Sequence, residues 1–195
     1  MKKNLMTAII IAAVVLLAVS CETTTSAAPA PAAAPAPSSA SADSVLVWFE
    51  AESGTDNKGI WVIKDVAEAS GGKLIVTKTA KAKESPIMNS SIKYTFNVAK
   101  EGKYIAVIRF RAAKDGDGSF FFQINGGSTV HSAYENSSKF QWDYFNNDNT
   151  GTAAVFNLKA GENTILIHHR EPNTEIDKFL VTDNLTLKAA DAEKM

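Results

Sequence analysis

Three acidic residues are spaced so that they could bind a metal ion. Glu50 and Glu52 are separated by one residue in a segment, 45–52, where apolar and polar residues alternate. This period of two predicts a β-strand on which both carboxylates point to the same side, about 7 Å apart. Asp177 directly follows Ile176 at the start of a second apolar segment, where an unpaired carboxylate is costly to bury. A hard cation with oxygen ligands, calcium above all, fits the three acids and predicts that the first and last strands meet. The alternative is that Glu50 and Glu52 lie on a solvated strand end.

Two aromatic residues could hold a sugar. Trp142 and Tyr144 lie two positions apart between polar segments, so they project to the same side of a predicted strand. The apolar face of a pyranose packs on such rings, and neighbouring polar groups bind its hydroxyls. The alternative is that one or both belong to the core. His131 and Tyr134, in the polar segment 128–138, are further candidates, although a lone loop histidine is usually only solvated.

Motifs for other chemistry are absent from the sequence. It contains no nucleophile elbow, Walker loop, Rossmann fingerprint or zinc-ligand spacing. His168 and His169 are adjacent on a predicted strand, so they point to opposite faces and cannot chelate one ion together. Glu50 and Glu52 share one strand and do not flank a cleft, which favours metal binding over glycoside hydrolysis. We therefore expect a protein that is not an enzyme.

The N-terminus predicts export and lipidation. Met1–Ser20 combines two lysines with a long apolar run that ends in small residues before Cys21, the only cysteine. This pattern is typical of a secretory signal peptide, and the small residues before Cys21 resemble the lipobox of bacterial lipoproteins. We expect a lipid on the Cys21 thiol and attachment to a bacterial membrane of the cell envelope, the outer membrane in particular. The alternative is a free cysteine at the end of a membrane anchor.

Charge and composition define the rest of the chain. Removal of residues 1–20 takes away Lys2 and Lys3 and no acid, so the 20 basic residues become 18 against 21 acidic ones, a net charge of −3. No basic face is predicted, which argues against a nucleic-acid partner. Residues 21–43 are rich in Ala, Pro, Ser and Thr and read as an extended tether. Without a disulfide, the exported domain would gain from a structural metal.

Short strands separated by turn signals predict the fold. Alternating segments recur about every ten residues between residues 44 and 188, and none has a helical period. We therefore expect an all-β sandwich over 44–188 that includes a short last strand at 185–187, followed by a charged tail, 189–195. A polar loop at Arg170–Thr174 is expected to be available for ligand contacts.

A resemblance spans almost the whole predicted domain. In order along the chain stand Glu50-Ala51-Glu52, the turn Ala69–Lys73, the segment FFFQINGG at 120–127, Trp142-x-Tyr144, the turn Ala160–Asn163 and Ile176-Asp177-Lys178-Phe179. Together they resemble carbohydrate-binding modules of families 6 and 35, which are galactose-binding-like β-jelly rolls. The resemblance implies a structural calcium at Glu50, Glu52, Asp177 and backbone oxygens of the 70–73 turn.

The resemblance also implies a sugar site in the loops at one end of the sandwich. Trp142 and Asn173 match the aromatic and the amide that the family often uses there. Tyr144 replaces a more usual Trp, and Glu171–Thr174 departs from the glycine of related loops, so Asn173 can also be only a turn residue. We expect non-catalytic binding of a polysaccharide or other glycan by a lipid-anchored module. The alternative is a structural or adhesive lipoprotein that binds a protein, which a broad apolar patch on a sheet face would favour.

Overall fold

The computed structural model describes residues 44–77, 89–114, 118–148 and 150–195. Within these ranges the chain forms β-strands and three short 3-10 helices, with no α-helix. The strands are β1 (Leu46–Glu50), β2 (Trp61–Asp65), β3 (Lys73–Thr77), β4 (Ser91–Val98), β5 (Gly102–Ala112), β6 (Ser119–Ile124), β7 (Thr129–Ala133), β8 (Ser137–Tyr144), β9 (Phe156–Leu158), β10 (Gly161–His169) and β11 (Glu175–Thr182). The 3-10 helices are η1 (Ala51–Ser53), η2 (Ser70–Gly72) and η3 (Ala189–Lys194).

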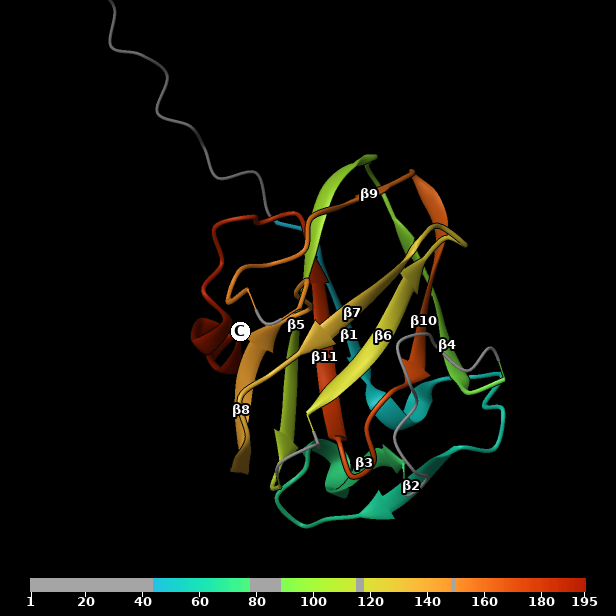
Figure 1. The fold of residues 1–195 in the computed structure, drawn as a ribbon. Helices are drawn as coiled ribbons and strands as arrows, with labels where there is room; N and C mark the ends of the chain where they lie inside the picture. Colours follow the sequence, from blue (N-terminus) through green and yellow to red (C-terminus); the bar gives the residue numbers. More distant parts are fainter. Residues whose placement is uncertain (1–43, 78–88, 115–117, 149) are drawn as a thin grey trace, which may run out of the picture. The chain divides into compact units, whose positions relative to one another are not determined.

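The strands form two sheets (Figure 1). The larger has the order β2-β3-β11-β5-β8, with β1 also on β11 and β9 also on β5. The smaller has the order β4-β10-β6-β7. All of the pairs between named strands are antiparallel. The predicted all-β sandwich is therefore confirmed.

The first and last strands meet, as predicted. β1 pairs with β11 from Leu46 opposite Thr182 to Glu50 opposite Lys178. β3 takes the remaining part of the same β11 edge, where Ile75 lies opposite Ile176. The register between β11 and β5 shifts between Ile176 and Lys178, which is typical of a β-bulge. Asp177 lies at this bulge, where the ends of β1 and β3 approach each other.

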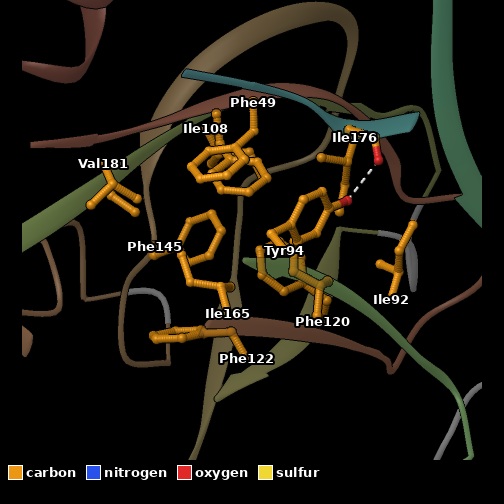
Figure 2. Packing of buried hydrophobic residues seen from close by; sticks show 14 of the residues in the cluster. Phe49, Ile92, Tyr94, Ile108, Phe120, Phe122, Phe145, Ile165, Ile176 and Val181 are labelled. Carbon is orange, nitrogen blue, oxygen red and sulfur yellow. Dashed lines mark hydrogen bonds between the residues drawn. The ribbon is translucent and has the colours of Figure 1, made fainter. Parts of the chain in front are cut away.

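Aromatic rings fill the space between the sheets. Phe179 of β11 stacks on Phe49 at 4.5 Å between ring centroids and meets Tyr94 edge-on at 4.8 Å. Phe145 contacts Phe120 and Phe122 of the smaller sheet at 5.3 and 5.0 Å. Figure 2 shows Phe49, Tyr94, Phe120, Phe122 and Phe145 together in the core. The Tyr94 hydroxyl donates to the Ala51 carbonyl at 2.7 Å. The core residues that lie in alternating segments occupy every second position of their strands, so the alternation of apolar and polar residues in the sequence predicted them.

The chain turns earlier than predicted at its first strand. β1 ends at Glu50, and Ala51–Ser53 form η1 instead of continuing the strand to residue 52. Ala51 is buried, and its carbonyl accepts the Tyr94 hydrogen bond, which holds the turn in place. Glu52 therefore does not lie on the same strand as Glu50.

The polar segment 128–138 contains a strand where a loop was predicted. β7 pairs with β6 through Thr129–Ala133. Ser132 points inward and is fully buried, and its hydroxyl donates to the Tyr134 hydroxyl at 2.6 Å. Sequence alternation missed β7 because a hydrogen-bonded serine occupies a core position that an apolar residue usually takes.

The predicted last strand at 185–187 is wrong, and the charged tail is part of the fold. After β11 the chain turns, and Leu187 packs on the outer face of the larger sheet. η3, within the predicted tail 189–195, contacts β8, and Ala192 is buried (Figure 1). This C-terminal segment, residues 187–195, covers Ile105, Val107 and Leu180.

The predicted anchor lies outside the described residues. Met1–Ser20, Cys21 and the tether 21–43 precede them. In the ranges that are described, no helix is long and apolar enough to cross a membrane.

Candidate functional site

The predicted metal-binding acids lie together around η2. Ser70 binds two of them, because its hydroxyl donates to Glu50 Oε1 at 2.8 Å and its backbone N–H donates to Asp177 Oδ1 at 2.7 Å. Gly71, with φ of 60°, brings the turn close to the third, since a Cβ there would lie 3.6 Å from Glu52 Oε1. This carboxylate cluster, Glu50, Glu52 and Asp177, thus joins the first strand, η1 and the last strand.

The cluster has oxygens without partners. Among the described residues, Glu50 Oε2 and Glu52 Oε2 are buried and accept no hydrogen bond. Burial raises the pKa of Glu52, and the nearby charges of Glu50 and Asp177 raise it further. Like charges that share a partly buried site are stabilised by a cation, so these oxygens fit a calcium ion.

Asp177 already has a cationic partner from the chain itself. Its side chain is fully buried, and its Oδ2 pairs with Arg109 Nη1. Within the described ranges, no three His, Cys, Asp or Glu side chains are arranged so that they could hold a metal ion alone. A cation at this cluster would therefore also need backbone oxygens of the 70–73 turn or a movement of Asp177.

Trp142 and Tyr144 project to the same side, as predicted, but they face the C-terminal segment. The Tyr144 hydroxyl donates to the Leu187 carbonyl at 2.8 Å and accepts from the Ala189 N–H at 3.1 Å. Trp142 Nε1 donates to Glu193. Both are partly buried on the outer face of the larger sheet, and neither lies in the loops at the end of the sandwich as expected. Sequence could not reveal this, because nothing in residues 187–195 predicted that they cover β8.

Replacing Trp142 by alanine tests its role. The indole meets Trp48 edge-on, at 6.0 Å between centroids, and binds Glu193. We expect Trp142→Ala to lower the free energy of unfolding by about 2 kcal/mol, from the lost ring pair and hydrogen bond. Thermal melts measure this, and Trp142→Phe, which keeps a ring, should lose less. A Trp142→Ala protein of unchanged stability that no longer binds glycan would instead establish a sugar-stacking role.

Tyr134 belongs to the core, which corrects its place among the sugar-binding candidates. It is 7% exposed, and its ring packs on Phe110 at 4.2 Å and on Phe120 at 5.6 Å. His131 lies on β7, and its Nδ1 is 3.0 Å from the Asp148 carboxylate. Burial lowers the pKa of His131, and the charge of Arg170 lowers it further. Neither residue lines the cavities described below.

The burial of His168 is expected to make the stability of the fold depend on pH. It is 2% exposed, both ring nitrogens lack a hydrogen-bond partner among the residues that the structure describes, and burial lowers its pKa below the ordinary value near 6.5. Because the pKa of His168 is lower in the folded protein than in the unfolded chain, the unfolded chain takes up the proton at a higher pH. The contribution of His168 to the free energy of unfolding is therefore complete above about pH 6.5 and is lost as the pH falls below that value. Denaturant melts between pH 7.5 and 5 should show this loss, at most about 1.4 kcal/mol per pH unit per histidine. His168→Leu should flatten the slope, and an unchanged slope would contradict the assignment.

A polar cavity of about 300 Å³ lies at the end of the sandwich where β5 finishes and β8 and β11 begin. Its walls are Arg111, Ala113, Lys114, Ser138, Asn173 and Glu175. Of the predicted sugar residues it contains Asn173 but not Trp142. Asn173 has φ of 57°, and its N–H donates to the Thr77 carbonyl at 2.7 Å, so it shapes the loop as well as lining the cavity. We call this the loop-end cavity.

Charged partners fix the wall of the loop-end cavity. Glu175 accepts from Lys64 at 2.5 Å and from Arg111. Burial tends to raise the pKa of Glu175, but these two cationic donors lower it overall, so the carboxylate stays ionised. The Arg111 guanidinium also lies over the Phe140 ring, 4.7 Å from its centroid. The sequence did not point to Arg111, Ser138 or Glu175 as site residues. Only Arg111 had a signal in the sequence, because Arg109 and Arg111 alternate with core residues and so point outward from their strand.

A second cavity of about 610 Å³ lies at the other end of β5. It is lined by Glu101, Gly102, Ile124, Asn125, Gly127, Asn157, Leu158 and Lys159. The side chain of Asn125 is used by the fold, because it donates to Asn163 and accepts from the Thr164 N–H. Asn157 is exposed there and offers a matched amide for control experiments at a distance from Asn173.

Comparison with solved structures identifies the fold. A family 35 carbohydrate-binding module from Clostridium thermocellum matches with a TM-score of 0.52 and 20% identity, over 69% of this chain and 97% of that module. The C-terminal family 6 module of a laminarinase from Zobellia galactanivorans matches with a TM-score of 0.53 and 16% identity, over 71% of this chain and 100% of that module. The fold is that of carbohydrate-binding modules of families 6 and 35.

Enzymes match only in part. An exo-β-1,3-galactanase from Phanerochaete chrysosporium has a TM-score of 0.53 and 20% identity, over 70% of this chain but 29% of the enzyme. No protein-family model matches the chain, and no curated protein sequence matches it significantly. The similarity thus concerns a module and not a whole hydrolase.

Proposed function

We propose that this protein binds a glycan without catalysis, through the loop-end cavity. The observation that carries the proposal is the match to isolated carbohydrate-binding modules over 97 and 100% of their length. The exo-β-1,3-galactanase matches over only 29% of its chain, which favours binding over hydrolysis. The resemblance of the sequence motifs to the same two families supports the proposal independently.

The loop-end cavity has the chemistry to bind sugar hydroxyls. The Asn173 amide both donates and accepts, and the Ser138 hydroxyl does the same. Glu175 and Arg111 pair with each other, and the carboxylate can accept and the guanidinium can donate further hydrogen bonds, so a hydroxyl beside the pair can donate to Glu175 and accept from Arg111. The Phe140 ring packs against the Arg111 guanidinium and helps to hold it at the cavity wall.

A glycan array with the full-length protein tests this function. We expect retention of at least one polysaccharide or oligosaccharide class and weaker retention for Asn173→Ala. Melting curves of both proteins would show that the variant is folded. No retention on any glycan would contradict the proposal.

A structural calcium at the carboxylate cluster is part of the proposal. Glu50, Glu52 and Asp177, with backbone oxygens of the 70–73 turn, would hold the ion, and its charge would offset the three acids. At a free calcium concentration of about 100 times Kd, the ion would stabilise the fold by about 2.7 kcal/mol. Melts with calcium and with chelator test it, and identical curves would contradict it.

Membrane attachment is the third part. Cys21 would carry the lipid, and residues 21–43 would hold the module away from a bacterial membrane of the cell envelope. Cys21→Ser should abolish lipid labelling and release the protein from membranes. Lipid labelling that persists in Cys21→Ser would contradict the lipoprotein assignment.

One observation favours protein binding as a second candidate. Leu46 and Trp48 of β1 are 42% and 37% exposed on the outer face of the larger sheet, beside Trp142. Trp is enriched at protein interfaces, so this face could contact a partner protein. Trp48→Ala should then abolish partner capture while glycan retention is unchanged.

A further inference from the structure

Arg109 connects the carboxylate cluster to three other parts of the fold. Its guanidinium pairs with Asp177, donates to the Glu68 carbonyl at 3.3 Å and lies 4.3 Å from the Phe140 ring centroid. Its Nε is also 3.7 Å from the Glu193 carboxylate of the C-terminal segment. These contacts hold a positive charge against the one acid of the cluster that is fully buried.

We infer that Arg109 is a resident counter-ion that allows the domain to fold without calcium and competes with calcium for Asp177. The inference rests on the calcium site proposed above. In this role Arg109 compensates the negative charge of Asp177. Glu50 and Glu52 cannot do so because they are acidic, and the Ser70 turn cannot because it carries no charge.

The electrostatics of the cluster support this role. A fully buried aspartate that loses its partner carries a large desolvation cost, because the charge is no longer compensated. In the described part of the chain, the Asp177 carboxylate binds the Ser70 N–H and Arg109, and of these two partners only Arg109 carries charge. Arg109 therefore does for Asp177 what a metal ion would otherwise do.

Competition follows from the positions of the partners. A divalent cation drawn to the unpartnered oxygens of Glu50 and Glu52 would share Asp177 with the guanidinium. Two positive groups next to one carboxylate repel each other, so each weakens the binding of the other. Glu193 offers Arg109 a second carboxylate, which keeps the guanidinium paired when its contact with Asp177 weakens.

Arg109→Met tests the inference, because methionine keeps an unbranched apolar side chain against Phe140 and removes the charge. Arg111→Met is the matched control. Arg111 lies on the same strand and also packs on Phe140, but its acidic partner is Glu175, which Lys64 also neutralises. Melts of the full-length protein and both variants are recorded in chelator and in calcium, and calcium affinity is measured by titration calorimetry.

We expect Arg109→Met in chelator to melt about 10 °C below the parent. Calcium should raise its melting temperature more than that of the parent, and its calcium affinity should exceed the parent's by about tenfold. Arg111→Met should respond to calcium as the parent does. If Arg109→Met lowers the melting temperature by the same amount in chelator and in calcium, while calcium still stabilises the parent, the inference is overturned. The calcium site itself would then remain supported. Proteins that all bind no calcium would overturn both.

Discussion

Phe179→Ala is expected to lower the free energy of unfolding by about 3–5 kcal/mol. Phe179 is fully buried at the centre of the core and contacts Phe49, Tyr94 and Phe145, at 4.5, 4.8 and 5.5 Å between centroids. Those rings come from three different strands or loops, so they cannot all move to fill the space. The cost therefore includes a cavity as well as the lost burial of the ring.

Chemical denaturation monitored by tryptophan fluorescence measures this change. Val155→Ala is the control, because Val155 is 54% exposed and its truncation should change stability by less than about 0.5 kcal/mol. A Phe179→Ala protein that unfolds within 1 kcal/mol of the parent would mean that the ring does not hold the two sheets together.

Gly54→Ala is expected to cost up to about 3 kcal/mol, because the site has no room for a methyl group. A Cβ at Gly54 would lie 2.4 Å from Ile92 Cγ1 and 3.0 Å from Tyr94 Cε1. Both neighbours are buried, so relief requires a shift of β4 or of the turn η1. A shift of η1 would move Glu52 and should also weaken calcium binding at the carboxylate cluster.

Gly59→Ala separates crowding from backbone strain. Gly59 has φ of 82°, but a Cβ there would meet no atom of the described residues within 4 Å, so the expected cost is only about 1 kcal/mol. Thermal melts of both variants measure the difference. Equal stabilities of the two would show that the turn at Gly54 relaxes freely.

Sequence alternation predicted most of the strands because core residues point inward at every second position. Ile92, Tyr94 and Phe96 on β4 and Phe120 and Phe122 on β6 are buried as this pattern requires. The meeting of the first and last strands was predicted from a cation shared by Asp177, Glu50 and Glu52; β1 does pair with β11, whereas the cation stays a prediction. The pattern failed at β7, where Ser132 is buried with its own hydrogen bonds, and at Glu52, where the buried Ala51 ends the strand in a turn.

The candidate site was harder to predict, because it depends on contacts between distant segments. Trp142 has the residue type and spacing of a sugar-stacking ring, yet Glu193 lies beside it, 51 positions away in the sequence. Arg109 is predicted from its alternation to point outward, and its partner Asp177 lies at the bulge in β11, which alternation does not predict. Asn173 was chosen by resemblance to the family; the structure shows it in the loop-end cavity, and its contact with a sugar stays a prediction.

Titration of the full-length protein with a glycan retained on the array is the most direct test of the proposed binding site. The parent and two amide variants are compared by calorimetry: Asn173→Ala in the loop-end cavity and Asn157→Ala in the cavity at the other end of β5. We predict that the parent and Asn157→Ala bind with equal affinity and that Asn173→Ala binds about tenfold more weakly, which corresponds to about 1.4 kcal/mol. Asn173→Ala that binds like the parent, or a parent that binds no glycan, would contradict the account.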